Sequence, residues 1–254
     1  MNSDVSKGKR VAVVTGATSG IGYATAVALL ELGINVVGIG RRGDRLKSAE
    51  YELSSDNAQF FGVEVDLTEP HSFESAIRLA KDEFNVLPSC FIISAGIGLK
   101  GTLLKSDETL WESLIKTNYY SVMKQMKQSA LTCLDVDPEV VRDIVVIGST
   151  AGSKVSSVNP VYGSTKFAIA SLVEALRQEV CHENIRVTLI EPGFVKTEFQ
   201  QVAEYDPAWV EQLEESVGPF LKPEAIANVI SHIVSQSKEV NINYVQIKPS
   251  RQKT

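Results

Sequence analysis

The chain has 254 residues, of which 44% are hydrophobic, so it can bury one sizeable core and has the length of a single α/β domain. Its formal net charge of −6 at pH 7 argues against nucleic acid or an anionic membrane as the main partner. No run approaches the roughly 18 apolar residues of a membrane span, and residues 1–10 lack the apolar centre of a secretory signal, which predicts a cytoplasmic protein.

Short β-branched segments alternate with longer amphipathic segments along almost the whole chain. The sequence predicts strands at residues 10–15, 35–40, 59–66, 89–95, 143–149, 186–191 and 244–247. It predicts helices between them at residues 24–32, 72–84, 109–133, 162–181 and 223–235. Several predicted strands are almost continuous apolar runs, which is typical of parallel strands buried on both faces. The pattern predicts a Rossmann-type α/β fold, a doubly wound parallel sheet of about seven strands between two layers of helices, as one domain over residues 1–254.

The first predicted strand leads directly into a glycine-rich turn, T-G-A-T-S-G-I-G at residues 15–22, which opens the first helix. Gly16, Gly20 and Gly22 follow the spacing G-x-x-x-G-x-G. Glycines at this junction let the backbone turn tightly and approach a pyrophosphate at the helix N-terminus. The turn therefore predicts a dinucleotide site, and the simpler alternative is a tight turn with close packing.

The end of the second predicted strand indicates which dinucleotide is bound. An acidic residue there hydrogen-bonds the ribose 2′-hydroxyl of NAD, whereas a nearby arginine accommodates the 2′-phosphate of NADP. This chain has Arg41 and Arg42 at that point and no carboxylate. Planar guanidinium groups bind phosphate well, so the sequence predicts NADP(H). The alternative is a pair of solvated arginines at a helix start.

Tyr162 and Lys166 stand four residues apart and share one face of a predicted helix. A nearby cation favours the phenolate form of tyrosine, and such a phenol can exchange a proton with an alcohol or a developing alkoxide. Because the same spacing occurs in ordinary surface pairs, its interpretation depends on the rest of the chain.

No metal site is predicted, because the histidines and cysteines show no ligand spacing. An odd number of widely separated cysteines is typical of reduced thiols in a cytosolic protein. The residues concerned are Cys90, Cys133, Cys181, His71, His182 and His232.

With this glycine spacing and a later Tyr-x-x-x-Lys, the chain resembles the short-chain dehydrogenase/reductase family over residues 9–249, and is similar to its compact single-domain branch. One departure is Ile93-Ser94-Ala95-Gly96, which replaces the usual Asn-Asn-Ala-Gly and removes two amides that contact the adenosine ribose and brace the sheet. The resemblance implies that the cofactor is bound by Gly16, Thr18, Ser19, Gly20, Ile21, Gly22, Arg41, Arg42, Asp66, Leu67, Ala95, Gly96, Tyr162, Lys166, Pro192, Gly193, Val195 and Thr197.

The same resemblance implies four catalytic residues: Asn118, Ser149, Tyr162 and Lys166. Tyr162 would be the general acid in reduction and the general base in oxidation, and Ser149 would hydrogen-bond the substrate oxygen. Lys166, with the oxidised nicotinamide, would lower the pKa of Tyr162 and hold the nicotinamide ribose. Asn118 would anchor a water that links Lys166 to solvent. The structural alternatives are a buried polar contact for Asn118 and a helix cap for Ser149.

These features imply an NADP(H)-dependent oxidoreductase that transfers a hydride between the nicotinamide and a small carbonyl or secondary alcohol substrate. Two alternatives stay open, a 3-oxoacyl-carrier-protein reductase-like enzyme and a catalytically silent NADP(H)-sensing protein. Residues 240–249, together with Gly40-Arg41-Arg42, are similar to the NADP-dependent serine/3-hydroxy-acid dehydrogenase and clavulanate-dehydrogenase-like subgroup. The family resemblance also implies a homodimer or homotetramer.

Residues 194–219 follow the sixth predicted strand, where the family has a substrate lid. Aromatic side chains at Phe199, Tyr205 and Trp209 are expected to form a wall of the substrate pocket. The alternative is an amphipathic helix at residues 208–217 that packs Trp209 and Leu213 inward.

Overall fold

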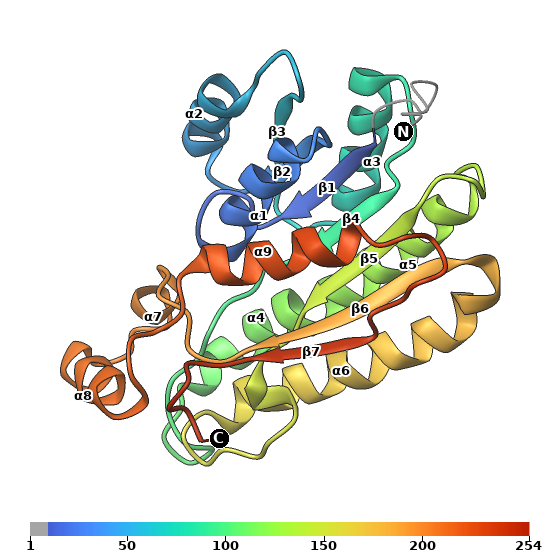
Figure 1. Cartoon of the computed structure of the whole chain (residues 1–254). Coiled ribbons are helices and arrows are strands. Elements are labelled where there is room, and N and C mark those ends of the chain that lie inside the picture. Colours follow the sequence, from blue (N-terminus) through green and yellow to red (C-terminus); the bar gives the residue numbers. More distant parts are fainter. Residues whose placement is uncertain (1–9, 254) are drawn as a thin grey trace.

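The computed structural model describes residues 10–253, and within this range seven parallel strands form one sheet (Figure 1). The strands lie in the order β3-β2-β1-β4-β5-β6-β7. The chain builds outward from β1 to β3, then crosses back and builds outward from β4 to β7, which confirms the predicted doubly wound topology. The strands are β1 Val11–Thr15, β2 Asn35–Gly40, β3 Phe60–Glu64, β4 Cys90–Ile93, β5 Arg142–Ile147, β6 Ile185–Pro192 and β7 Tyr244–Ile247.

Helices cover both faces of the sheet (Figure 1). One cluster of buried apolar residues joins one face to α1, α2 and α9, and a second cluster joins the other face to α3, α5 and α6. The helices are α1 Gly20–Glu31, α2 Gly43–Leu53, α3 Ser72–Phe84, α4 Trp111–Ile115, α5 Ser121–Leu134, α6 Pro160–Val180, α7 Phe199–Val202, α8 Pro207–Val217 and α9 Pro223–Val234.

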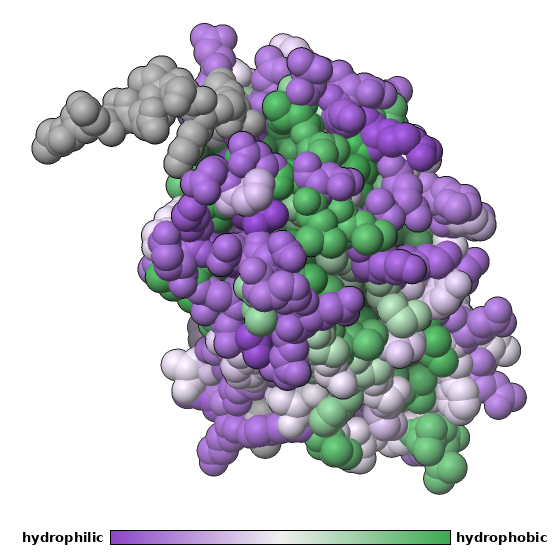
Figure 2. Space-filling model, turned by 90° about the vertical axis from the view of Figure 1, so that its right-hand side faces the viewer, coloured by the Kyte–Doolittle hydropathy of each residue, from purple (hydrophilic) through white to green (hydrophobic). Residues whose placement is uncertain are grey.

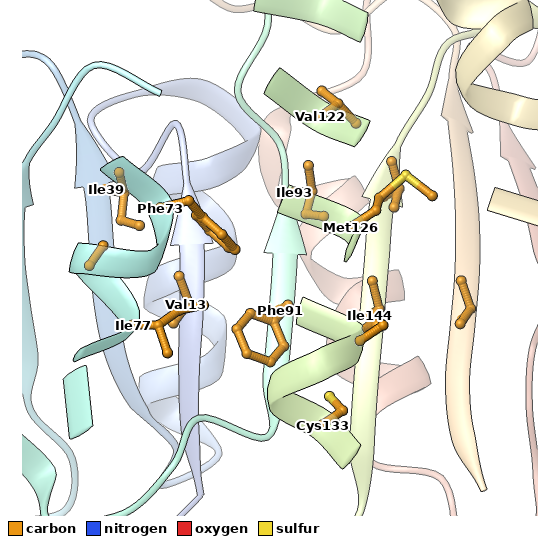
Figure 3. Close-up of a cluster of buried hydrophobic side chains, with 14 of the residues drawn as sticks. Val13, Ile39, Phe73, Ile77, Phe91, Ile93, Val122, Met126, Cys133 and Ile144 are labelled. Atoms are coloured by element: carbon orange, nitrogen blue, oxygen red, sulfur yellow. The ribbon is translucent and has the colours of Figure 1, made fainter. Parts of the chain in front are cut away.

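The core on the α3, α5 and α6 face fixes the relative positions of the central strands. Figure 3 shows Val13, Phe91 and Ile144 on three strands, with Ile77 of α3 and Met126 of α5 packed over them. Burial of apolar surface contributes about 25 cal/mol per Å², so this layer is a main source of stability. Because β1, β4 and β5 are held together here, their carboxyl ends are held in place as well.

The predicted strands and helices agree with the structure to within a few residues, with two omissions and one interruption. The sequence does not predict α2, a mostly polar helix in which only Leu46 and Ala49 are buried, or α7, a four-residue helix with no buried residue. The helix predicted at 109–133 is present, but a π-helical turn at Lys116–Tyr120 separates α4 from α5.

Residues 1–9 and 254 lie outside this description, and so does most of the segment 1–10 for which the sequence predicts no secretory signal. Within residues 10–253, no helix has the length and apolar character needed to cross a bilayer. In the same range, no group of three or more His, Cys, Asp or Glu side chains is placed to hold a metal ion. The cysteines are free thiols, and burial raises the pKa of Cys90 to about 12.

Candidate functional site

The carboxyl ends of the strands surround a cavity of about 1140 Å³ beside β1 and β4, where the strand order reverses. Open parallel sheets bind ligands at this switch point. The volume exceeds the roughly 300–1,000 Å³ of ordinary small-molecule pockets, so a dinucleotide and a small substrate fit together. All predicted site residues except Asn118 line it: Gly16, Thr18, Ser19, Gly20, Ile21, Gly22, Arg41, Arg42, Asp66, Leu67, Ala95, Gly96, Ser149, Tyr162, Lys166, Pro192, Gly193, Val195 and Thr197.

The glycine turn has a backbone that side chains would obstruct. Gly16 and Gly20 have φ angles of +72° and +55°, in the left-handed region that favours glycine. A Cβ on Gly22 would lie 2.4 Å from the carbonyl oxygen of Gly16, and a Cβ on Gly16 would lie 3.1 Å from the Cα of Ala95. The turn therefore packs closely against β4 and leaves the first N–H groups of α1 beside the cavity, an arrangement that fits a pyrophosphate.

Thr15 connects the end of β1 to the end of β4. Its Oγ1 accepts hydrogen bonds from the backbone N–H groups of Ser94 at 3.0 Å and Ala95 at 3.2 Å, and Thr15 is fully buried. A hydroxyl group on the neighbouring strand thus braces the segment from which Ile93-Ser94 has removed the usual amides. Sequence reasoning misses this contact, because it joins residues 79 positions apart in the chain.

Asp66 follows β3 at the edge of the cavity. Its carboxylate accepts the backbone N–H of Thr68 at 2.9 Å and the Thr68 hydroxyl at 2.8 Å. The hydrogen bonds from Thr68, with a smaller contribution from Arg41, hold the pKa of Asp66 below its usual value. The carboxylate is therefore fixed and ionised beside Leu67.

A basic cluster lies after β2, where Arg42 reaches across the glycine turn. Its Nη2 donates to Thr18 Oγ1 at 2.6 Å and to Ser19 Oγ at 2.7 Å, and its Nη1 donates to Glu198 Oε2 at 2.6 Å. Arg45, on the first turn of α2, donates to Glu198 Oε1 at 2.7 Å. Hydrogen bonds from the two arginines lower the pKa of Glu198 to about 2.

Sequence reasoning finds Arg42 of this cluster but misses Arg45 and Glu198, whereas the predicted Arg41 lines the cavity and acts on Asp66. Arg45 follows Arg42 by three residues, a same-face spacing that becomes visible only once α2 is recognised as a helix. Glu198 gives no such signal, because its contact with Arg42 spans 156 positions in the chain.

Tyr162 and Lys166 lie on the first turns of α6, and each is only 7% exposed. Ser149, which follows β5, interacts with the Tyr162 hydroxyl and acts to lower its pKa. The Lys166 Nζ donates to the carbonyl oxygen of Ile147 at 3.1 Å and lies 5.9 Å from the centre of the Tyr162 ring. Ser149 caps a short 3₁₀ turn by accepting the N–H of Ala151, which confirms the helix-cap interpretation.

Burial dominates the proton equilibria of this pair. It raises the pKa of Tyr162, although the hydrogen bond to Ser149 acts in the opposite direction. Burial also lowers the pKa of Lys166 to about 8. The expected lowering of the Tyr162 pKa by Lys166 is not seen in the protein alone, because removal from water disfavours both the phenolate and the ammonium. At neutral pH the phenol is therefore protonated.

Asn118 lies in the π-helical turn and is fully buried. Its Nδ2 donates to the carbonyl oxygen of Ile97 at 2.7 Å, and its Oδ1 accepts the N–H of Ile97 at 2.8 Å. A Cβ on Gly96 would lie 3.3 Å from this Oδ1 and 3.8 Å from the Nζ of Lys166. Asn118 thus stands behind the cavity wall, where it holds the loop after β4 and reaches the neighbourhood of Lys166. Single π turns are frequent at functional sites.

The segment 194–219 packs directly over the Tyr162 side of the cavity. The ring of Phe199 meets the ring of Tyr162 edge-on, with centroids 5.6 Å apart. The Tyr205 hydroxyl accepts a hydrogen bond from Asn159 Nδ2 at 3.1 Å, and its ring centroid lies 5.3 Å from that of Trp209. The segment contains the expected amphipathic helix as α8, in which Trp209 and Leu213 line the cavity and no residue is fully buried.

The chain after β6 runs along the other side of the cavity. The Gly193 N–H donates to the carbonyl oxygen of Ile247 at 2.7 Å, and Val195 forms a bridge with Leu221. A Cβ on Gly20 would lie 3.1 Å from the methyl carbon of Thr197. The segment after β6 therefore lies against the glycine turn and forms one wall of the cavity.

The parallel sheet, the glycine turn at the switch point and the cavity along the strand ends define a dinucleotide-binding protein of the Rossmann type. A family model described as short chain dehydrogenase matches residues 10–207. The chain therefore belongs to the short-chain dehydrogenase family and is an NAD(P)-dependent oxidoreductase.

Individual relatives agree with this assignment. The chain is 30% identical over 240 residues to an uncharacterized oxidoreductase of Staphylococcus aureus strain MRSA252, which covers 94% of this chain and 97% of the relative. It is similar to the alcohol dehydrogenase of the archaeon Thermococcus sibiricus complexed with 5-hydroxy-NADP, with 25% identity, a TM-score of 0.83 and coverage of 97% and 99%. It is also similar to the closed form of a serine dehydrogenase complexed with NADP+, with 27% identity, a TM-score of 0.84 and 96% coverage of each chain.

Proposed function

We propose that the protein is an NADP(H)-dependent oxidoreductase that transfers a hydride between the nicotinamide and a carbonyl or secondary alcohol substrate. One observation carries the proposal: Tyr162, Ser149 and Lys166 line one cavity together, the same cavity that begins at the glycine turn, with the Lys166 Nζ 5.9 Å from the centre of the Tyr162 ring. A proton donor and a second hydroxyl are the groups that a carbonyl oxygen needs as negative charge develops on it.

The residues of this chain divide the chemistry as follows. The nicotinamide supplies the hydride chemistry when it is bound, and the protein orients the reactants and handles the proton. In reduction, Tyr162 donates its phenolic proton to the substrate oxygen, while Ser149 hydrogen-bonds that oxygen. In oxidation, Tyr162 takes the proton back. Phe199 packs on Tyr162 and helps to exclude water from this step.

Lys166 and Asn118 serve the supply of protons and the placement of the cofactor. Because burial lowers the pKa of Lys166 to about 8, its ammonium exchanges a proton readily near neutral pH. Lys166 would also hold the nicotinamide ribose. Asn118 would anchor the water that links Lys166 to solvent, from its position behind Gly96.

The choice of NADP(H) is supported by the basic cluster after β2. Arg42 and Arg45 converge there with the hydroxyls of Thr18 and Ser19, and these donors suit a phosphate. The rest of the cofactor would lie along the glycine turn and the strand ends, against Asp66, Leu67, Ala95, Gly96, Pro192, Gly193, Val195 and Thr197.

The substrate is proposed to be a small carbonyl or alcohol compound that binds beneath residues 194–219, which would act as a lid. The contacts of Phe199 with Tyr162 and of Tyr205 with Asn159 support this role. The likeness to a serine dehydrogenase structure supports the serine/3-hydroxy-acid dehydrogenase and clavulanate-dehydrogenase-like subgroup.

We also propose that the chain is a single cytoplasmic domain over residues 1–254 and forms a homodimer or homotetramer. Figure 2 shows one face of the molecule, on which apolar residues reach the surface between hydrophilic ones. Exposed apolar side chains along the helical segment from 108 to 134 and on α6 would be covered in such an assembly. They are Leu110, Ile115, Tyr120, Leu131, Leu134 and Phe167.

Replacement of the proton donor tests the proposed function. Tyr162→Phe keeps the ring and its contact with Phe199 but removes the transferable proton, so turnover of NADPH with a reactive carbonyl is expected to fall by about 10²–10⁴-fold. The dissociation constant for NADPH, measured by fluorescence titration, is expected to stay within about twofold.

Tyr51→Phe is the matched control, because Tyr51 is 90% exposed on α2 and should leave both quantities unchanged. Near-native turnover by Tyr162→Phe would overturn the mechanism. If the unaltered protein binds NADPH but turns over no member of a panel of ketones, aldehydes and 3-oxoacyl thioesters, the catalytically silent sensor is the better description.

A further inference from the structure

The carboxylate of Glu198 accepts the hydrogen bonds that a bound anion would accept at the same place. Its two carboxylate oxygens accept hydrogen bonds from Arg42 at 2.6 Å and from Arg45 at 2.7 Å. Arg42 also donates to the hydroxyls of Thr18 and Ser19, which keeps its guanidinium at the edge of the glycine turn. Two guanidinium groups and two hydroxyls form a site for an anion with several acceptor oxygens, and the carboxylate of Glu198 occupies its arginine side.

The 2′-phosphate of NADP(H) requires the same donors, because an arginine after β2 is the group that accommodates this phosphate. Two anions on one pair of guanidiniums repel each other, so the carboxylate and the phosphate exclude each other from the site. We propose that Glu198 is a specificity-determining residue, an internal competitor whose carboxylate must leave Arg42 and Arg45 before a 2′-phosphate binds them. This inference rests on the proposed preference for NADP(H).

The competition also reaches the substrate side of the cavity. Glu198 is followed directly by Phe199, whose ring packs on Tyr162. When a 2′-phosphate takes the two arginines, Glu198 loses the ion pairs that hold the start of residues 194–219 against α2. NADH has no 2′-phosphate and leaves these ion pairs in place. Binding of NADPH therefore requires that these ion pairs break, whereas binding of NADH does not.

The expected size of the effect follows from the exposure of the ion pairs. The side chains of Arg42, Arg45 and Glu198 are 40%, 43% and 39% exposed, so solvent weakens each pair. Exposed ion pairs change an equilibrium by about 1.4- to 5-fold each. The two ion pairs together correspond to about 2- to 25-fold, so removal of the Glu198 charge is expected to tighten NADPH binding by about 3- to 10-fold, in the middle of that range.

The experiment measures dissociation constants of the full-length protein by isothermal titration calorimetry. Glu198→Gln is compared with the unaltered protein, using NADPH, NADH and adenosine 2′,5′-bisphosphate as ligands. The bisphosphate carries the 2′-phosphate but no nicotinamide, so it reports on the phosphate site without any turnover. Glu204→Gln is the matched control, because Glu204 lies in the same segment and pairs with Lys100 at 3.2 Å, away from the arginines.

The proposal predicts that Glu198→Gln tightens binding of NADPH and the bisphosphate by about 3- to 10-fold, leaves NADH within about twofold, and raises the affinity more than Glu204→Gln does. In an Arg45→Gln background the gain should shrink, because one of the two contested donors is then absent. Unchanged binding of the bisphosphate, or an equal gain for NADH, overturns it. Weaker binding of all three ligands would instead show that Glu198 helps to hold the cofactor in place.

Failure of the proposed NADP(H) preference and failure of the proposed role of Glu198 give different results. If the unaltered protein binds NADH at least as tightly as NADPH, the proposed preference for NADP(H) fails. The change in bisphosphate affinity on Glu198→Gln still decides the role of Glu198. If NADPH is preferred and Glu198→Gln has no effect, only the competition is wrong.

Discussion

The two ends of the parallel sheet both bury charged side chains, but they surround them differently. At the amino ends, Asp143 is 1% exposed and accepts hydrogen bonds from Arg10 and Arg186, each at 2.7 Å. Arg186 also donates to backbone carbonyl oxygens after α9. At the carboxyl ends, Lys166 is nearly as buried, yet its hydrogen bond goes to the neutral carbonyl oxygen of Ile147.

The charged groups at the amino ends have counter-ions inside the fold, whereas Lys166, which is proposed to act in proton transfer, has none among its hydrogen-bond partners within residues 10–253. The carboxylate of Asp143 has two guanidinium partners that oppose the rise in its pKa caused by burial, and its removal leaves two cations without their partner. A buried ammonium beside a carbonyl is only partly compensated, and its pKa falls as a result. A strongly shifted pKa in a cleft is a feature of functional sites. The folded state therefore tolerates the cost of Lys166 where the cofactor and substrate would lie.

Breaking the amino-end cluster should have the largest effect on stability. Asp143→Ala leaves Arg10 and Arg186 buried without a carboxylate, so the free energy of unfolding is expected to fall by about 3–5 kcal/mol in urea titrations. Glu139→Ala is the control, because its ion pair with Lys238 at 2.8 Å is exposed to solvent and should contribute much less to stability. Similar losses for the two variants would contradict the comparison.

Removing the charge at the carboxyl end should act in the opposite direction. Burial lowers the pKa of Lys166 from 10.5 to about 8, which corresponds to a cost of about 3 kcal/mol while both folded and unfolded states are charged. Lys166→Met is therefore expected to raise the free energy of unfolding at pH 7 by up to about 3 kcal/mol, while activity is lost.

The stability difference between Lys166→Met and the unaltered protein should depend on pH. Between pH 8 and pH 10.5 the folded protein releases the Lys166 proton while the unfolded chain keeps it, so this group adds stability as the pH rises. The advantage of Lys166→Met should then shrink across that interval. Urea titrations at pH 7 and pH 9.5 measure it, with the exposed Lys127→Met as control. A lower stability of Lys166→Met at pH 7 would show that the ammonium is well compensated.

A smaller effect is expected at the junction between β1 and β4. Thr15→Val keeps the shape of the side chain but leaves the N–H groups of Ser94 and Ala95 without their acceptor, at a cost of about 1–3 kcal/mol. Hydrogen exchange should speed up at these two amides more than at the amides of β4. Thr132→Val is the control, because the Thr132 hydroxyl only adds a bond to a helical carbonyl oxygen.

Local patterns in the sequence predict most of the fold and many of the site residues. Apolar runs such as residues 144–147 identify buried strands, and their ends place Ser149 and Asp66 at one edge of the sheet. Patterns of this kind do not reach α2, because most of its residues are polar and only two of them are buried. Contacts between distant segments, such as Arg42 with Glu198, have no local signature at all.

The proton equilibria of the site are also beyond sequence reasoning. The spacing of Tyr162 and Lys166 predicts that the cation favours the phenolate, and that expectation treats both groups as solvated. In the fold both are buried, and the loss of water outweighs their mutual effect. Burial of individual side chains depends on how α6, β5 and residues 194–219 pack together, which only the structure supplies.

The reciprocal pair between Asn118 and Ile97 has a consequence for how this scaffold can change. Because the side-chain amide satisfies both backbone groups of Ile97, and Thr15 holds Ser94 and Ala95, the chain after β4 is fixed on both sides of Gly96. Beyond Ile97, Gly98 packs closely against Phe199 and Ala203, whereas residues 102–105 are exposed. Changes of length or composition confined to residues 102–105 should therefore leave Gly96 and Lys166 in place.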